Sequence, residues 1–199
     1  RWPREGCGHP AAGRRRRLGL ASPQGVYYNH RAMPSPRRTA DIRLSILVKA
    51  EPAEVYRALT SARELCVWWL DRAETDARNM GRWRMEWGLS ARAGRREAVG
   101  AFVDLEPARK VAFIEEDKTL PKGLPPLSTF FIEKRPRAAE VTLVQAGFSA
   151  SARGVAQLTA ARAHWEDCLA KLKVYLETGR ARKAETLSLA RLPRRRQDV

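Results

Sequence analysis

Two tryptophans flank a methionine at alternate positions in GRWRMEWG, residues 81–88. Successive side chains of a β-strand point to opposite faces, so Trp83, Met85 and Trp87 would share one face of a sheet. Aromatic rings and a soft thioether suit contact with an apolar or aromatic small molecule. The same pattern also fits a strand whose buried face only packs in a core. Both interpretations stay open on this stretch alone.

Side chains that transfer protons are poorly placed for catalysis, because a catalytic acid or base has to lie inside the pocket. His164 adjoins Trp165 but falls off the apolar stripe of its predicted helix, and Glu86 would face away from the tryptophan pair. The acidic run at residues 115–117 opens a loop and is typical of a solvated turn. Gln145 can face inward and fix the polar end of a ligand, but an amide is neither acid nor base. We therefore expect no catalytic residue, and an enzyme is the less favoured interpretation.

Metal and cofactor chemistry has no sequence support either. Cys7, Cys66 and Cys168 are far apart, the histidines are equally scattered, and neither set has metal-ligand spacing. No Ser/His/Asp set or phosphate-binding loop is present. We expect no metal and no cofactor. An odd number of dispersed cysteines favours a reducing, cytoplasmic setting.

The net charge of +16 is concentrated at the two ends of the chain. Residues 1–40 carry +8, residues 41–178 carry +3 and residues 179–199 carry +5. Basic tails bind polyanions through their charge, so any nucleic-acid binding is expected to be non-specific and confined to the tails. No apolar run reaches the roughly 18 residues of a membrane span, so none is expected.

Residues 1–40 are rich in Arg, Pro, Gly and Ala and lack apolar periodicity. We predict a disordered basic N-terminal extension. Met33 begins a plausible chain, which suggests that residues 1–32 are a leader, a cloning remnant or an over-extended reading frame, with a transit peptide as the weaker alternative. Whether these residues belong to the native protein is left open.

The ordered part, residues 41–178, begins with a predicted strand at 42–49. A short helix follows from Pro52, and a Ser61/Glu64 capping box predicts a second one. Strand patterns recur near 73–78, 81–88, 96–105, 109–116, 127–135 and 138–146. The gaps between them are too short for crossover helices, so neighbouring strands should pair antiparallel.

A long amphipathic helix is predicted at 155–178, with Gly179 as its C-terminal cap and a basic tail at 179–199. This helix is the only element long enough to cover the apolar face of the sheet. The sheet should therefore curl around it. The tails lack apolar periodicity, so we expect residues 41–178 to fold without them.

Several strings in this order resemble the SRPBCC, or START-like, superfamily and, within it, the heat-shock-protein-90 ATPase activator homologue family. The strings are VKAEPAEVYRALTSARELCVWW, MGRWRMEWG, GAFVDLEPARKVAF, STFFIEK and AEVTLVQAGF. The resemblance is carried by Pro52, Val55, Leu59, Trp68, Trp69, Gly100, Glu106, Pro107, Phe113, Gly147, Phe148, Trp165 and Leu172. The insert DKTLPKGLPP and the basic extensions depart from the family pattern.

The resemblance implies an α+β helix-grip fold, in which a curved antiparallel sheet of about seven strands wraps around a long C-terminal helix, with two short helices after the first strand. In this fold the sheet and the long helix enclose a cavity. The ligand-binding residues expected there are Trp69, Trp83, Met85, Trp87, Phe102, Phe113, Phe130, Ile132, Leu143, Gln145, Trp165, Leu169 and Leu172.

The expected function is binding of an apolar or aromatic small molecule in this cavity. The superfamily also contains chaperone activators and polyketide cyclases, and a fold does not determine a function. A protein-interaction module whose partner is a chaperone or another protein is therefore one alternative. A cyclase-like enzyme is the other.

Overall fold

The computed structural model describes residues 39–88, 96–116, 126–149 and 151–192. The predicted N-terminal extension up to residue 38 and nearly all of the DKTLPKGLPP insert lie outside these ranges.

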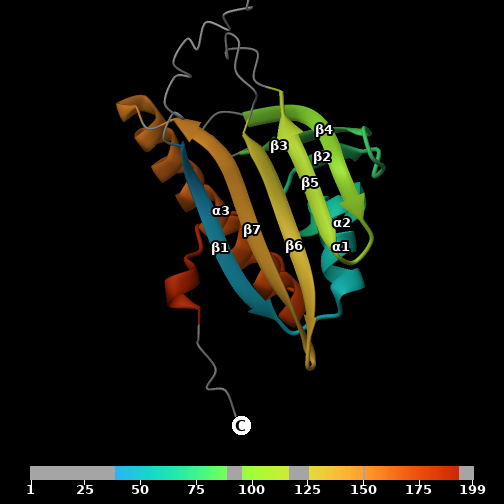
Figure 1. Cartoon of the computed structure of the whole chain (residues 1–199). Coiled ribbons are helices and arrows are strands. Elements are labelled where there is room, and N and C mark those ends of the chain that lie inside the picture. The colour runs from blue at the N-terminus through green and yellow to red at the C-terminus, as the bar shows by residue number, and fades with distance from the viewer. Residues whose placement is uncertain (1–38, 89–95, 117–125, 150, 193–199) are drawn as a thin grey trace, which may run out of the picture. The chain divides into compact units, whose positions relative to one another are not determined.

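Seven antiparallel strands form one sheet in the order β1-β7-β6-β5-β4-β3-β2 (Figure 1). Their bounds are β1 Thr39–Val48, β2 Arg72–Thr75, β3 Arg82–Trp87, β4 Arg96–Glu106, β5 Lys110–Glu115, β6 Leu127–Arg135 and β7 Ala138–Ser149. From β2 to β7 each strand pairs with the next strand in the chain. Strand β1 pairs with β7, so β1 and β2 are the two edge strands. The expected antiparallel α+β sheet is confirmed.

Alternation of residue type determines which face of each strand is buried. In β1, Ile42, Leu44, Ile46 and Val48 are buried and the residues between them are exposed. The pairing of Leu44 with Leu143 on β7 continues this apolar face into the neighbouring strand. The buried face of the sheet therefore follows directly from the two-residue period of the sequence.

Two short helices, α1 (Pro52–Thr60) and α2 (Ala62–Trp68), follow β1. The reciprocal contact expected at Ser61 is absent, because the Ser61 side chain makes no capping hydrogen bond. The Glu64 carboxylate instead accepts a hydrogen bond from the Tyr175 hydroxyl, at 2.5 Å. A capping contact occurs one helix earlier, where the Glu51 backbone N–H donates to the Glu54 carboxylate at 2.9 Å.

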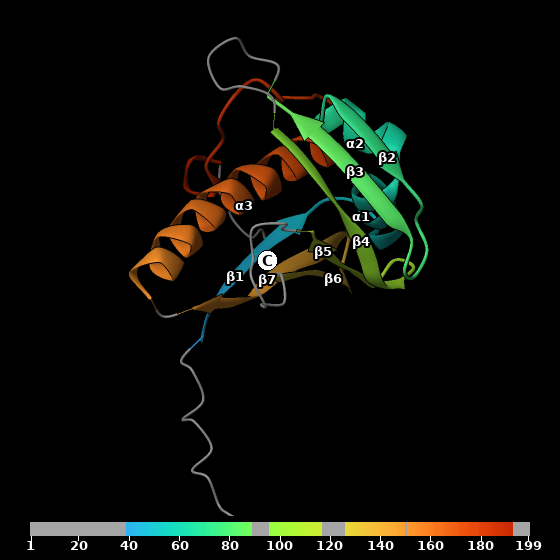
Figure 2. The same ribbon diagram turned by 90° about the horizontal axis from the view of Figure 1, so that it is seen from above.

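The long helix α3 (Ala152–Thr178) lies along the concave face of the sheet, and its C-terminal end reaches α2 (Figure 2). The Ser151 hydroxyl caps its first turn by accepting from the Gly154 backbone N–H at 3.1 Å. Gly179 ends it with a φ of 69°, a left-handed conformation that glycine adopts without strain. The core lies between α3 and the sheet, where Leu169 and Leu172 are fully buried.

Residues 180–192 fold back over α2 and α3. The Lys183 ammonium donates to the backbone carbonyls of Cys66 and Leu70, each at 3.0 Å. The Leu187 backbone N–H donates to Asp167 Oδ1 at 2.7 Å, and a short 3-10 helix, η1 (Leu189–Arg191), follows. The contacts of the folded domain thus continue past residue 178, where the sequence pattern placed its end.

Candidate ligand-binding cavity

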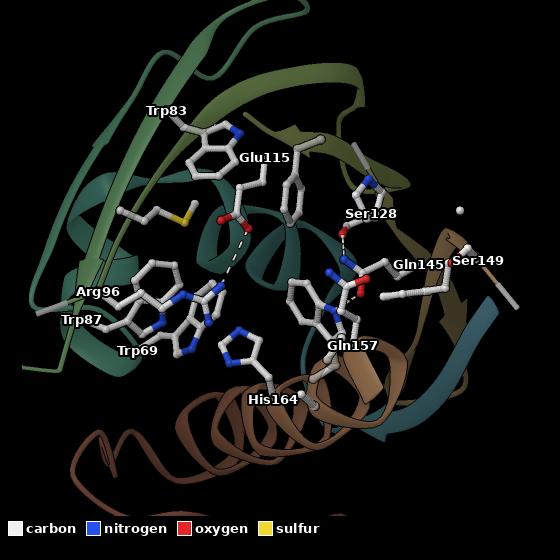
Figure 3. Close-up of a pocket in the computed structure, with 18 residues that line it drawn as sticks. Trp69, Trp83, Trp87, Arg96, Glu115, Ser128, Gln145, Ser149, Gln157 and His164 are labelled. Carbon is white, nitrogen blue, oxygen red and sulfur yellow. Dashed lines mark hydrogen bonds and ion pairs between the residues drawn. The ribbon is translucent and has the colours of Figure 1, made fainter. Parts of the chain in front are cut away.

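A cavity of about 460 Å³ lies between the concave face of the sheet and the N-terminal half of α3 (Figure 3). Side chains from β3, β4, β5, β6, β7 and α3 line it, together with Trp69 at the end of α2. A volume of this size is within the range of roughly 300–1,000 Å³ found for sites that hold drug-sized ligands. The space is therefore large enough for a small organic molecule.

Strand β3 supplies one wall of the cavity. Trp83, Met85 and Trp87 all line it, as their alternate spacing requires. Trp83 and Met85 are each 4% exposed. Trp83 pairs with Gly100 on β4, and a Cβ atom added at Gly100 would lie 2.3 Å from Cζ2 of the indole. The missing side chain of Gly100 therefore leaves room for the Trp83 ring.

Aromatic contacts connect this wall to α2, β5 and α3. The rings of Trp69 and Trp87 meet edge to face with centroids 5.6 Å apart, and those of Trp83 and Phe113 do the same at 5.7 Å. Phe113 also contacts the Trp165 ring at 6.2 Å. These separations are those of favourable aromatic pairs, so the rings hold one another in place around the cavity.

A pair of opposite charges lies at the rim of the cavity. The Arg96 guanidinium carbon is 5.0 Å from the centroid of the Trp87 ring, and Arg96 Nη2 is 3.8 Å from Glu115 Oε2 (Figure 3). The two side chains are 56% and 48% exposed. An ion pair this exposed contributes little to stability, so folding alone does not require it.

A polar group of three side chains lies at the other end. Gln145 Nε2 donates to Ser128 Oγ at 3.0 Å, and Trp165 Nε1 donates to Gln145 Oε1 at 2.8 Å. These bonds fix the orientation of the Gln145 amide. The Ser128 hydroxyl accepts from Gln145 and keeps its own proton to donate. This end can therefore orient a polar atom of a ligand.

His164 lines the cavity, although the sequence pattern placed it off the apolar stripe of the helix and outside the pocket. Its ring contacts those of Trp69, Trp87 and Trp165. Burial, followed by the positive charge of Arg96, lowers the pKa of His164 to about 4. The imidazole is therefore neutral at pH 7. In the N-terminal half of α3, Gln157, Ala160, Ala161 and His164 follow one another at spacings of three or four residues. They therefore share one face of the helix, and this face lines the cavity.

The predicted site residues divide into two groups. Those that line the cavity are Trp69, Trp83, Met85, Trp87, Phe113, Gln145 and Trp165. Those that the structure places in the packed core instead, at 0–4% exposure, are Phe102, Phe130, Ile132, Leu143, Leu169 and Leu172. The second group belongs to the buried apolar cluster and is not part of the cavity lining.

Most of the polar lining does not follow from the apolar pattern of the sequence. The further lining residues are Arg96, Glu115, Pro126, Ser128, Gly147, Phe148, Ser149, Gln157, Ala160, Ala161 and His164. A signal for two of them was available. Ser128 is two residues before the inward-facing Phe130, and Glu115 is two residues after Phe113, so the strand period alone places both on the cavity side. A search restricted to apolar residues passes over them.

The two indole N–H groups of β3 are buried without an acceptor among the described residues, at Trp83 Nε1 and Trp87 Nε1. A buried donor that lacks a partner costs roughly 1–3 kcal/mol. Phenylalanine would fill a purely apolar wall without that cost. Tryptophan at these two positions therefore costs stability that packing alone does not account for.

Within the described ranges no group of three or more His, Cys, Asp or Glu side chains could hold a metal ion. None of the helices in this part of the chain is long and apolar enough to cross a membrane. The chemistry of the cavity consists of apolar contact, hydrogen bonding at Gln145 and Ser128, and charge at the rim.

Comparison with known proteins shows what the chain is similar to. The family model described as Activator of Hsp90 ATPase homolog 1-like protein matches residues 49–177. A search of curated proteins found no match.

Solved structures share the fold at low sequence identity. The Aha1 dimer from Colwellia psychrerythraea is 19% identical with a TM-score of 0.58, over 70% of this chain and 98% of that one. Protein CV1439 from Chromobacterium violaceum is 21% identical with a TM-score of 0.58, over 69% and 97% of the two chains. CalU16 from Micromonospora echinospora is 17% identical with a TM-score of 0.53, over 71% and 78%.

Identities this low show the fold alone, but the family model spans more than half of the chain. The sheet that curves around α3 is also the helix-grip architecture that the sequence strings implied. The chain belongs to the Activator of Hsp90 ATPase homolog 1-like family, with its SRPBCC-type helix-grip fold.

Proposed function

We propose that the protein binds an apolar or aromatic small molecule in the cavity between the sheet and α3. The observation that carries this proposal is a space of about 460 Å³ walled by aromatic rings, among them Trp69, Trp87, Phe113 and Trp165. Protein interiors are close-packed and contain few voids larger than a water molecule. A space of this size among rings that could have collapsed together therefore supports a binding role.

Two further features support the proposal. Among the described residues the indole N–H groups of Trp83 and Trp87 have no acceptor, and such a buried donor costs stability that an apolar core would not lose. The lining also combines broad apolar walls with a few polar groups, which is the usual make-up of small-molecule sites. A reducing, cytoplasmic setting belongs to the same proposal, and it is supported by the free thiols of Cys66 and Cys168.

The test uses N-phenyl-1-naphthylamine, a neutral aromatic dye whose emission rises in apolar surroundings. We expect the full-length protein to raise the emission of the dye in a saturable way. Ala161 lines the cavity from α3, so Ala161→Trp should fill the space and abolish the response. Ala163 is exposed on the same helix and is not part of the lining, so Ala163→Trp is the matched control and should respond as the wild type does.

A folded wild-type protein that gives no saturable response, or an equal response from Ala161→Trp, would contradict the proposal. The second candidate function, a protein-interaction role resembling that of a chaperone activator, would then be favoured. The family to which the chain belongs supports that alternative.

A further inference from the structure

We propose that the cavity selects aromatic carboxylates, with the ligand's carboxylate paired to Arg96 in place of Glu115. This inference rests on the proposed function, because it assigns a chemical class to the ligand of the same cavity. It is carried by the position of Arg96, the weakness of its present ion pair and the rings beside it.

The guanidinium of Arg96 is held at the rim of the cavity by the β3–β4 pairing and by the ring of Trp87. Arg96 pairs directly with Trp87 across the β3–β4 ladder. Its guanidinium carbon lies 5.0 Å from the Trp87 ring centroid, a distance at which a cation is attracted to the face of an aromatic ring. The positive charge is therefore held next to the apolar wall.

Glu115, the present ion-pair partner of Arg96, is easily replaced by another carboxylate. Arg96 Nη2 and Glu115 Oε2 are 3.8 Å apart, which is too long for a hydrogen bond. Glu115 is 48% exposed, so its carboxylate can turn into water at little cost. A ligand carboxylate that approaches from within the cavity can form the two parallel hydrogen bonds that arginine favours.

A cationic ligand is disfavoured at the rim, where an anionic ligand is favoured. A cation that pairs with Glu115 would lie beside the guanidinium of Arg96, which is 3.8 Å from that carboxylate, and the two like charges would repel each other. The positive field of Arg96 also reaches into the cavity, because it contributes to the lowered pKa of His164. The rim therefore discriminates by the sign of the ligand's charge.

The aromatic walls of the cavity lie next to the positive charge of Arg96. Phe113 and Glu115 share one face of β5, two residues apart, and both line the cavity. Trp87 and Trp69 form the wall on the other side of Arg96 (Figure 3). An aromatic ring seated between these walls places a carboxylate attached to it within reach of Arg96.

Three probes of the same shape separate charge from apolar contact: 2-naphthoate, 2-naphthamide and 2-naphthamidine. Each is titrated into the full-length protein by isothermal titration calorimetry at pH 7, where the first is an anion and the last a cation. We expect 2-naphthoate to bind about 5-fold more tightly than 2-naphthamide, the ratio of a partly exposed ion pair. The amidine should bind most weakly.

Variants assign this preference to its residues. Arg96→Gln should make the naphthoate and naphthamide affinities equal, and Glu115→Gln should widen the ratio because it removes the competing carboxylate. Arg82 forms a comparable exposed ion pair with Glu116 at 2.8 Å, and neither residue lines this cavity. Arg82→Gln removes the same charge and is the matched control, which should retain the wild-type ratio.

Equal binding of 2-naphthoate and 2-naphthamide by the wild type would overturn the inference and leave the proposed function intact. Tightest binding of the amidine would overturn it as well, with the sign of the charge reversed. A preference for naphthoate that survives Arg96→Gln would show that another group carries it and would overturn the role of Arg96. If no probe binds and the neutral dye also fails, the proposed function itself is wrong.

Discussion

At the scale of single residues, His164 connects the cavity to the pH dependence of stability. Its pKa is lowered from 6.5 to about 4, first by burial and then by Arg96, while Asp167 opposes the shift. Between these values the unfolded chain binds a proton that the folded protein does not. The stability contributed by neutral His164 is therefore complete above about pH 6.5 and is lost as the pH falls toward 4.

We predict that acidification from pH 7 to pH 4.5 lowers the free energy of unfolding of the wild type more than that of the His164→Gln variant. The difference should reach about 2 kcal/mol, because glutamine has no proton to gain. Urea unfolding at the two pH values measures it. Carboxylates and the remaining histidines titrate alike in both proteins and cancel. Equal acid sensitivity, or an imidazole that titrates near 6.5 in the folded protein by NMR, would show that the ring is hydrated.

The residues of the site differed in how far the sequence could predict them. Trp83, Met85 and Trp87 followed from strand alternation, and all three line the cavity. Arg96 did not, because a single arginine among many carries no signal until the β3–β4 register brings it opposite Trp87. Strand period predicts the face on which a side chain lies, but pairing between strands determines its neighbour.

At the scale of secondary-structure elements, Gly100 of β4 allows the close approach of the β5 backbone and of the Trp83 ring from β3. A Cβ atom there would lie 2.0 Å from the Ile114 carbonyl oxygen and 2.3 Å from the Trp83 ring. Neither neighbour can yield without moving a strand or an indole. The contact therefore ties the shape of the cavity wall to one glycine of the sheet.

We predict that Gly100→Ala destabilises the protein by about 1–3 kcal/mol, the usual cost of overpacking. It should also weaken the response to the neutral dye, because Trp83 must move. Chemical denaturation and dye titration measure the two effects. Ala101 is the next residue of β4 and points to the other face, so Ala101→Ser should change stability by less than about 0.5 kcal/mol. A neutral effect of Gly100→Ala would mean that the strands adjust freely.

Element boundaries show where sequence patterns reach their limit. The start of α3 was predicted at residue 155, yet the helix begins at Ala152. Gly154 in its first turn argues against a helix by propensity. In the structure a Cβ atom at Gly154 would lie 2.0 Å from the Ser149 carbonyl oxygen, so glycine is required where β7 passes close to α3. The tight connection between β7 and α3 requires glycine there despite its low helix propensity, and the periodicity of the sequence does not reveal that connection.

At the scale of the whole molecule, the segment at residues 180–192 makes specific contacts with α2 and α3. Its charge and lack of periodicity made it read as a tail, because periodicity detects only segments that bury a continuous apolar face. The attachment here is polar and specific. The ammonium of Lys171, a residue only 7% exposed, lies 2.7 Å from Asp167 and donates to the Lys183 carbonyl at 3.2 Å. Lys183 in turn binds carbonyls at the end of α2, where a cation is favourable.

This network makes Asp167 a link between α3 and the returning chain, since it binds both Lys171 and the Leu187 N–H. We predict that Asp167→Ala lowers the free energy of unfolding by about 3–5 kcal/mol, because it leaves the buried ammonium of Lys171 without its opposite charge. Glu166→Ala, which breaks an exposed pair with Arg162 on the same helix, should cost less than about 1 kcal/mol. Adding Lys171→Met to Asp167→Ala should recover much of the loss, because the unpaired charge is then removed. Urea unfolding of the full chain compares the variants, and proteolysis near residue 187 should rise with Asp167→Ala and not with Glu166→Ala. If both single variants cost the same small amount, the C-terminal segment is a tail after all, and residues 41–178 should fold as well alone as with it.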